Sequence, residues 1–351
     1  MIYFNSDYTE GAHPRIIKYL TDTNMEQTTG YGEDHHCQRA AGLIRAACGC
    51  SDAEVHFLTG GTQTNLTVIS AALRPHQGVL SAETGHINVH ESGAIEATGH
   101  KVLALPSGAD GKITAKQVID SCEAHINDSA FEHLVQPKMV YISHPTENGM
   151  LYTKSELEAL RRACDKYKLL LFLDGARLSY GLTAKNTDVT LKYLAQLCDV
   201  FYIGGTKTGA LFGEALVITN PCLKEDFRYI MKQKGGMLAK GRLLGIQFCA
   251  LFEDNLYLDI AENANSLAYQ IADGCKRLGF ELLTESPTNQ QFPIFPNDLY
   301  EKLQESYVCT PWQAIDKDHT AVRLCTSWAT PQGNVTKLLE DLEKLSATGA
   351  F

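Results

Sequence analysis

The stretch that decides the fold is residues 169–177, with the sequence LLLFLDGAR. Its first five residues are apolar, and the run ends at Asp174. This pattern is typical of a parallel strand that is buried on both faces. A carboxylate at the end of such a strand must be paired or neutralised. Two interpretations stay open: Asp174 pairs with Arg177 at the start of a helix, or it faces a cationic ring nitrogen while Arg177 binds a substrate carboxylate.

Short apolar runs alternate with helical patterns on both sides of this stretch. Such alternation is typical of βαβ units on a parallel sheet. The predicted strands are residues 55–58, 79–82, 101–105, 138–142, 169–173 and 199–203, with residues 215–219 able to pair antiparallel. A turn and a helix are expected within residues 85–97, and Thr153 and Glu156 have the spacing of a helix capping box. We therefore expect an α/β fold with a mainly parallel sheet.

The pattern changes near residues 240–250. A long helix over residues 242–272 is expected to lead into strands at 280–283, 290–295 and 322–326, and then a final helix at 335–345. These elements predict a large domain over residues 15–245 and a smaller α+β domain over residues 246–351. The sequence leaves open whether residues 1–14 join the small domain.

Composition excludes several classes of protein. The chain has 351 residues and a net charge of −10, which argues against nucleic acid as the main partner. No run approaches the roughly 18 apolar residues of a membrane span, and no signal peptide is visible in residues 1–14. The eleven cysteines lack the spacing of a zinc site, so free thiols in a reducing compartment are expected, by default the cytoplasm. No metal is predicted.

Two further features follow predicted strands, where open α/β sheets bind ligands. Gly60, Gly61 and Thr62 lie between a strand and a helix, an arrangement that favours a phosphate; a simple tight turn is the alternative. Lys207 follows the strand at residues 199–203. Partial desolvation there lowers the pKa of an amine enough for covalent chemistry, whereas the alternative is a surface lysine in a loop.

Several histidines are candidates for proton transfer near neutral pH. His86 stands before a predicted helix, and His133 and His144 flank the predicted strand at residues 138–142. His35 and His36 are not assigned to a predicted element. Any one histidine is more often a structural or surface residue, and that is the alternative for each of them.

The combination of these features is more specific than any one of them. A phosphate-type loop, a strand-end Asp174 and a strand-end Lys207 are what pyridoxal 5'-phosphate requires. The loop binds the phosphate, the carboxylate keeps the pyridine nitrogen protonated, and the lysine binds the aldehyde.

On these motifs the sequence resembles the L-threonine aldolase and β-eliminating lyase family of fold-type I pyridoxal-phosphate enzymes, from about residue 5 to residue 245. The matching motifs are Ser6-Asp7, GYGED at residues 30–34, GTQTN at 61–65, the segment of His86 with Glu91 and Gly93, DGAR at 174–177, and Lys207. The resemblance implies a fold-type I large domain followed by a smaller α+β domain.

The resemblance also implies a reaction: retro-aldol cleavage of a β-hydroxy-L-amino acid of the threonine or allo-threonine type to glycine and an aldehyde. Lys207 would bind the cofactor covalently, and Asp174 would hold its ring nitrogen. His86 would stack on the ring, with His133 as the other candidate for proton transfer. The cofactor contacts implied are Gly61, Thr62, His86, Asp174, Arg177, Lys207 and Tyr31. The substrate carboxylate would be bound by Ser6, Arg177 and Arg323.

Three departures from the family pattern concern the site. Thr206 replaces a serine before the lysine, residues 144–146 read HPT where Glu-Asn-Thr is usual, and Leu238 stands where an arginine usually reaches a neighbouring subunit's phosphate. Lys240 and Arg242 are the candidates for that last contact. The family pattern implies a homodimer or homotetramer, with Tyr31 also contributed across the interface.

Two other functions stay open. One keeps the cofactor but changes the reaction to β-elimination or transamination of an amino acid. The other is a non-catalytic nucleotide-binding or interaction protein built on an α/β sheet.

Overall fold

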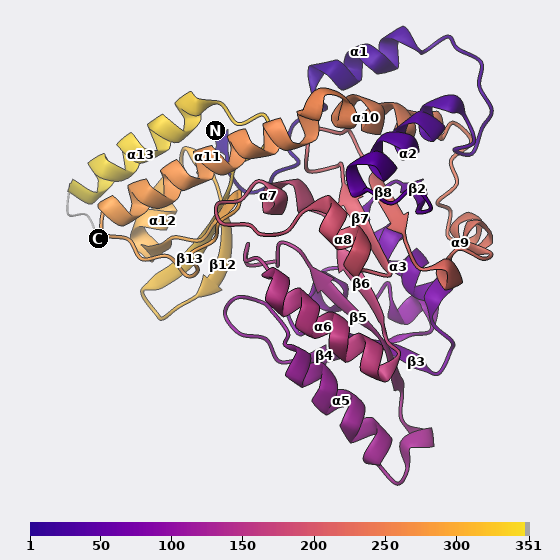
Figure 1. Cartoon of the computed structure of the whole chain (residues 1–351). Coiled ribbons are helices and arrows are strands. Elements are labelled where there is room, and N and C mark those ends of the chain that lie inside the picture. The colour runs from indigo at the N-terminus through magenta and orange to yellow at the C-terminus, as the bar shows by residue number, and fades with distance from the viewer. Residues whose placement is uncertain (348–351) are drawn as a thin grey trace.

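The larger part of the molecule is built on a seven-stranded sheet of order β2-β8-β7-β6-β5-β3-β4 (Figure 1). The structure is a computed structural model and describes residues 1–347. The strands are β2 (Glu54–Leu58), β3 (Gln77–Ala82), β4 (Lys101–Leu105), β5 (Gln136–Ser143), β6 (Leu170–Asp174), β7 (Val200–Gly204) and β8 (Glu214–Ile218). Strand β8 runs antiparallel to both neighbours, and the other pairs are parallel. The α/β prediction and the antiparallel strand are confirmed.

Helices cover both faces of this sheet. One face carries α1 (Pro14–Asp22), α2 (His35–Cys48), α5 (Ala115–Asn127), α6 (Lys154–Tyr167), α7 (Leu178–Leu182), α8 (Leu191–Leu197) and α10 (Arg242–Phe252). The other carries α3 (Gly61–Ala72), α4 (His86–Val89) and α9 (Phe227–Gln233). Side chains of β7 alternate between these layers: Phe201 and Ile203 enter the first core, and Val200 and Tyr202 the second. Burial on both faces explains the continuous apolar runs of the sequence.

Single-turn helices complete the connections: η1 (Glu96–Thr98), η2 (Phe131–His133), η3 (Pro221–Leu223) and η4 (Glu253–Asn255). The predicted capping box at the start of α6 is present, since Thr153 and Glu156 each satisfy the other's backbone N–H.

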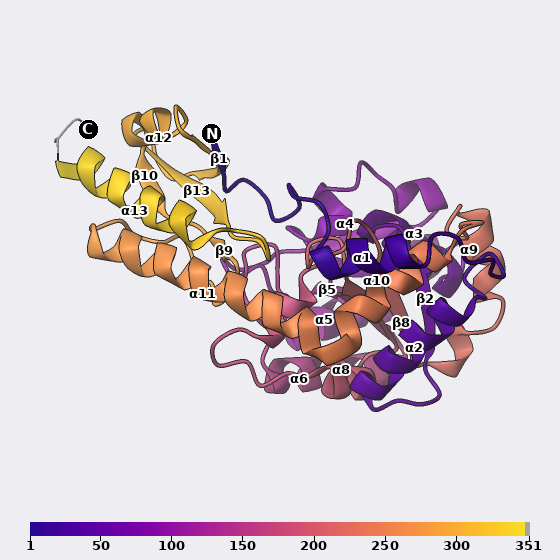
Figure 2. The same cartoon turned by 90° about the horizontal axis from the view of Figure 1, so that it is seen from above.

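A smaller part lies at the far end of the long helix α11 (Leu256–Arg277), as Figures 1 and 2 show. It contains β9 (Gln290–Gln291), β10 (Ile294–Pro296), α12 (Asn297–Leu303), β11 (Tyr307–Val308), β12 (Thr310–Ala314), β13 (His319–Cys325) and α13 (Gln332–Ala347). At the N-terminus, β1 (Ile2–Tyr3) pairs in parallel with β11, and Phe4 is buried in the core of this part. The first residues of the chain therefore pack with its C-terminal part. The domain bounds at residues 245 and 246 stay a prediction.

The structure corrects some predicted elements. The helix expected over residues 242–272 is interrupted, because Asp254 and Asn255 adopt positive φ angles of 51° and 62°. Asp and Asn tolerate this left-handed conformation better than most residues, so the break is encoded locally. The strand expected at residues 280–283 is reduced to one bridge between Leu282 and Pro293. The prediction also missed β12, an edge strand that contains Pro311.

Within residues 1–347, no helix combines the length and the apolar character that crossing a membrane requires. All eleven cysteines are free thiols.

Candidate active site

A cavity of about 280 Å³ lies at the carboxyl ends of the sheet strands. Strands β2, β5 and β6 each end at or next to a residue of its wall, and β7 contributes Tyr202, as expected for a ligand site on an open α/β sheet. The wall is formed by Tyr8, Thr59, Gly60, Gly61, Thr62, His86, Ser143, Pro145, Thr146, Glu147, Asp174, Ala176, Arg177, Tyr202, Thr206, Lys207 and Glu214.

Asp174 is the most highly coordinated side chain of the cavity. Its Oδ1 accepts hydrogen bonds from the Tyr202 hydroxyl (2.5 Å) and the Ala176 N–H (3.0 Å). Its Oδ2 accepts from the Tyr141 hydroxyl (2.5 Å) and the Asn65 amide (3.1 Å). Strand alternation places both tyrosines and Asp174 on one face of the sheet. Burial alone raises the pKa of Asp174, but the charge of His86 and these hydrogen bonds outweigh it and lower the pKa, so the group stays ionised.

His86 is held at the cavity by a second carboxylate. Its Nδ1 lies 2.7 Å from Glu91 Oε1, and that oxygen also accepts from the Asn65 amide at 2.7 Å. Burial lowers the pKa of His86, but the Glu91 hydrogen bond and the charges of Asp174 and Glu91 together raise it above its ordinary value. Asn65 thus links the carboxylates of Asp174 and Glu91 and fixes the position of the imidazole.

The start of α3 forms the third wall. The N–H groups of Gly61, Thr62 and Gln63 donate no hydrogen bond to any residue among 1–347. A Cβ at Gly61 would lie 2.9 Å from the Tyr202 hydroxyl, so only glycine fits there without displacing the ring. Free N–H groups at a helix start suit an anion such as phosphate.

Lys207 reaches the cavity from the loop that follows β7. That loop is fastened by Glu214, which accepts from the Gly205 N–H (3.2 Å) and the Thr206 hydroxyl (2.9 Å). Lys207 Nζ donates no hydrogen bond within residues 1–347. Burial and the charge of Arg177 lower the pKa of Lys207, while burial raises the pKa of Glu214 to about 8. A reactive neutral amine is therefore easier to form here than in water.

Arg177 forms a buried ion pair with Asp7 from the N-terminal segment. Its Nε and Nη2 donate to the two Asp7 oxygens at 2.7 and 2.9 Å, and Asn289 donates to Asp7 at 2.9 Å. Burial alone raises the pKa of Asp7, but the charge and hydrogen bonds of Arg177 outweigh it and lower the pKa. Nη1 of Arg177 makes no hydrogen bond within residues 1–347 and is left for a ligand in the cavity.

The Asp7→Asn variant is expected to be less stable by about 3–5 kcal/mol, because it leaves the buried Arg177 charge without its partner. The pKa of Asp7 is lower in the folded state than its unfolded value of about 3.9. The wild-type ion pair therefore contributes its stability above that value and loses it as the pH falls through the folded-state pKa. Urea unfolding at neutral and acidic pH measures both effects.

A matched control for this experiment is Asp22→Asn, which removes an exposed pair with Lys18. The expected loss in the free energy of unfolding is below about 1 kcal/mol, because water already screens such exposed pairs. Equal costs for the two variants would contradict the interpretation of the Asp7 pair.

Ser6 and Arg323, expected to bind the substrate carboxylate, do not line the cavity. Ser6 is buried. One Arg323 nitrogen, Nη2, donates to the Asn5 carbonyl at 2.9 Å, and the guanidinium lies 5.1 Å from the ring centre of Trp312. Its Nε is buried without a partner. Burial lowers the pKa of His90, and the positive charges of His86, Arg323 and Lys207 act in the same direction.

The structure does not bring His133 to the cavity. It is exposed on η2, just before the amino end of β5, whereas the cavity lies at the carboxyl end of that strand. The eight residues of β5 separate the two ends by roughly 25 Å. His133 thus cannot transfer protons in the site of its own chain.

Tyr31, Lys240 and Arg242 also lie outside the wall of the cavity. Tyr31 is 45% exposed, and its N–H donates to the Ala239 carbonyl. Arg242 is fully used within the chain, since its two terminal nitrogens donate to the carbonyls of Glu26 and Asn24. Lys240 is exposed, and its side-chain amine has no partner among residues 1–347.

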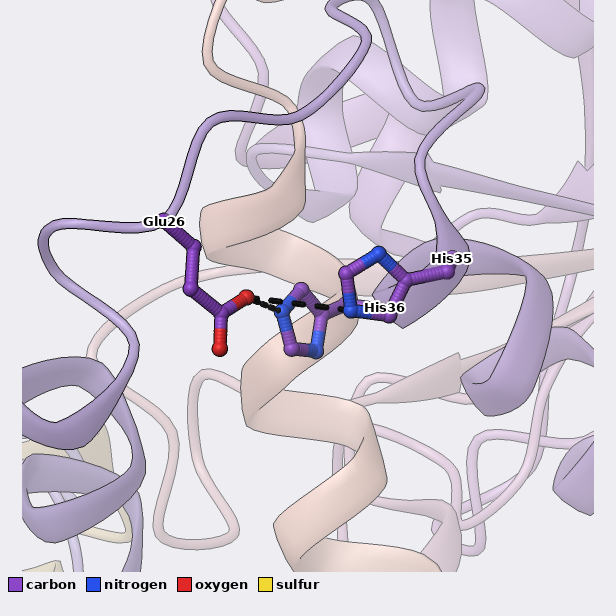
Figure 3. Close-up of side chains that lie close together, drawn as sticks. All are labelled: Glu26, His35 and His36. Atoms are coloured by element: carbon purple, nitrogen blue, oxygen red, sulfur yellow. Dashed lines mark hydrogen bonds and ion pairs between the residues drawn. The ribbon is translucent and has the colours of Figure 1, made fainter.

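One cluster of metal-type ligands occurs away from the cavity, within the described part of the chain. Glu26 Oε2 lies 2.7 Å from His36 Nε2 and 3.7 Å from His35 Nε2 (Figure 3). Glu26 and His35 are exposed, and the positive end of α2 disfavours a cation there. The Glu26–His36 hydrogen bond explains the arrangement without an ion, so we assign it no metal.

Sequence reasoning missed several residues of the site, of which Asn65, Glu147 and Glu214 carry the most chemistry. In the sequence, Asn65 stands out only as the last residue of the GTQTN motif at 61–65. A signal for Tyr141 and Tyr202 was present, because both lie at alternate strand positions on the face of Asp174. No pattern in the sequence singled out Glu147 or Glu214.

Comparison with known proteins identifies the same family along most of the chain. The family model described as "Beta-eliminating lyase" matches residues 4–296. A low specificity L-threonine aldolase of Pseudomonas aeruginosa is 30% identical over 352 aligned residues, which cover 97% of this chain and 96% of that protein.

Solved structures agree on the fold. A Leishmania major threonine aldolase has 44% sequence identity and a TM-score of 0.96, covering 99% of this chain and all of that one. An aspartate aminotransferase of Thermus thermophilus, at 14% identity, still reaches a TM-score of 0.73 over 98% of this chain and 91% of its own. The predicted fold-type I architecture is thereby confirmed.

Proposed function

This chain belongs to the beta-eliminating lyase family, and from that premise we propose that it is a pyridoxal-phosphate-dependent aldehyde-lyase. Its substrate is a β-hydroxy-L-amino acid of the threonine or allo-threonine type, which it cleaves to glycine and an aldehyde. The observation that carries the proposal is that Lys207, Asp174 and the start of α3 all line one cavity. The similarity to a low specificity L-threonine aldolase, at 30% identity over 97% of this chain, supports it.

The residues of the cavity fit pyridoxal phosphate. Within residues 1–347, Lys207 Nζ donates no hydrogen bond and the N–H groups near Gly61 are free to bind a phosphate, while Asp174 is held ionised. When bound, this cofactor supplies an electron sink for the pair released at the substrate Cα. Lys207 would hold it covalently, Asp174 would keep its ring nitrogen protonated, and His86 would lie against its ring.

Orientation of the substrate decides which bond at Cα breaks, because only the bond perpendicular to the cofactor ring is weakened. We assign this task to Arg177 Nη1, supported by Ser6 and Arg323, acting on the α-carboxylate. Asp7 holds the Arg177 guanidinium in a fixed plane by two hydrogen bonds. The buried, unpartnered Nε of Arg323 is a further donor that an anionic ligand would satisfy after a small movement.

We also propose that the protein acts as a homodimer or homotetramer. Tyr31 and Lys240, which are exposed and outside the cavity of their own chain, would contact the cofactor in a neighbouring subunit. Arg242 is the weaker candidate, since its guanidinium already binds two carbonyls. The free thiols support a reducing location, which we propose is the cytoplasm.

The test is to incubate the purified protein, loaded with pyridoxal phosphate, with L-threonine, L-allo-threonine, phenylserine or L-cysteine. Equal amounts of glycine and aldehyde are expected from the β-hydroxy amino acids. Formation of pyruvate from L-cysteine without any aldehyde would favour β-elimination, and conversion of the cofactor to its amine form would favour transamination. A colourless protein that does not change when pyridoxal phosphate is added would contradict the proposal and favour a non-catalytic protein.

A further inference from the structure

Glu147 is a carboxyl group of the cavity to which the assignments above give no role. It lies four residues beyond the end of β5, is half-buried, and forms part of the cavity wall with His86, Asp174 and Lys207. The motifs of the sequence did not point to it.

The two oxygens of Glu147 have different surroundings. Oε1 accepts the backbone N–H of His86 at 2.9 Å and the Ser143 hydroxyl at 2.7 Å. Oε2 accepts no hydrogen bond from any other residue among 1–347. A carboxyl group fixed through one oxygen holds the other in a defined position, which is the geometry that proton transfer to a bound molecule needs.

Among residues 1–347, the other two carboxyl groups of the cavity wall are already engaged through both oxygens. Asp174 accepts four hydrogen bonds, and Glu214 uses one oxygen for the Gly205 N–H and the other for the Thr206 hydroxyl. His86 is bound to Glu91 through Nδ1, and its ring is expected to lie against the cofactor. Glu147 is thus the carboxyl group of the wall with an unengaged oxygen.

The electrostatic surroundings of Glu147 suit this use. Burial raises its pKa, and the negative charge of Asp174 acts in the same direction. Three contacts lower the pKa of Glu147 without cancelling this rise: the Ser143 hydrogen bond, the backbone N–H of Glu147 itself, and the charge of His86. A carboxyl group whose pKa moves toward the working pH both takes and returns a proton more readily.

We propose that Glu147 Oε2 exchanges the proton of the substrate β-hydroxyl. This deepens the proposed function and rests on it. In cleavage, the proton passes from the hydroxyl to Oε2, and the O–H electron pair becomes the second C–O bond of the aldehyde. The Cα–Cβ bond breaks, and its pair stays with Cα. Cα then gains a proton to give glycine, and Glu147 loses its proton to solvent, so protons and electrons balance.

The Glu147→Gln variant tests the proposal, because the amide oxygen still accepts from His86 and Ser143 while the second position can no longer take a proton. The expected loss of kcat for L-threonine cleavage is about 10²–10⁴-fold, and the pH dependence that arises from Glu147 should disappear. Exchange of the glycine α-proton with deuterated water does not involve a β-hydroxyl, so its rate should stay within about threefold of wild type.

Infrared spectra of the cofactor-free protein supply a readout that is independent of activity. The pH difference spectrum of wild type should contain a protonated-carboxyl band that Glu147→Gln lacks. The matched control is Glu83→Gln, an exposed carboxylate after β3 that accepts the Ser107 N–H, and it should leave cleavage unchanged. The Ser143→Ala variant keeps the Glu147 carboxyl group but removes the hydroxyl that donates to its Oε1. It should lower kcat less than Glu147→Gln.

Distinct results separate failure of this inference from failure of the proposed function. If wild type cleaves no β-hydroxy amino acid, the proposed function fails. If wild type cleaves L-threonine and Glu147→Gln does so at a similar rate with the same pH profile, the inference fails. It also fails if the variant loses glycine α-proton exchange as severely as cleavage, because Glu147 then only maintains the shape of the cavity.

Discussion

The Lys207→Ala variant is expected to lose retro-aldol cleavage of L-threonine by a factor of about 10⁴ or more. Among residues 1–347, Lys207 has the only side-chain amine in the wall of the cavity, and alanine removes it. Burial and the charge of Arg177 together keep the pKa of that amine below its ordinary value. Covalent retention of the cofactor should be lost too. Both effects are measured by the rate of aldehyde release and by the visible absorption that remains after borohydride reduction and denaturation.

The control for Lys207→Ala is Lys101→Ala, which removes an exposed lysine of β4 that does not reach the cavity. That variant should keep both the activity and the borohydride-fixed absorption. If Lys207→Ala retained cofactor covalently after reduction, another amine would have to be the attachment point, and the assignment of Lys207 would be wrong.

The second large effect is expected for Asp174→Asn, with a loss of activity of about 10³-fold or more. The neutral amide cannot hold a proton on the ring nitrogen of the cofactor. It also replaces two acceptor oxygens by one, although four donors converge on this position. The unmatched donors should lower the free energy of unfolding by about 1–3 kcal/mol.

Asp199→Asn separates these two consequences. Asp199 accepts from Arg161 and from the Leu171 N–H at the amino end of the same strands, far from the cavity wall. The Asp199→Asn variant should lose a similar amount of unfolding free energy, measured by denaturant unfolding. It should keep its activity, measured by steady-state kinetics. An Asp174→Asn protein that is unstable but has wild-type kcat would show that the carboxylate serves only the fold.

The central sheet was predictable because its inner strands are short apolar runs buried on both faces. The run ending at Asp174 and the loop carrying Lys207 both place polar residues at carboxyl ends of strands, where parallel topology brings them together. That rule alone recovers the position of Asp174, Lys207 and the start of α3. The roles of these residues stay predictions until the variants are measured.

The same rule also explains what was missed. His133 precedes its strand, and so it lies at the opposite edge of the sheet despite its proximity in sequence to Ser143. Glu147 follows the strand by four residues, and only the tertiary fold shows that its Oε1 meets the His86 backbone. Long-range contacts of this kind leave no periodic signal in a single sequence.

The N-terminal segment contacts both the larger and the smaller part of the molecule. Its strand β1 pairs with β11 in the smaller part. Asp7, four residues after β1, accepts hydrogen bonds from both Arg177 of the larger part and Asn289 of the smaller part. Tilting the smaller part would therefore pull on the guanidinium that we assign to the substrate carboxylate. The N-terminal segment therefore ties the position of Arg177, to which we assign the substrate carboxylate, to the position of the smaller part.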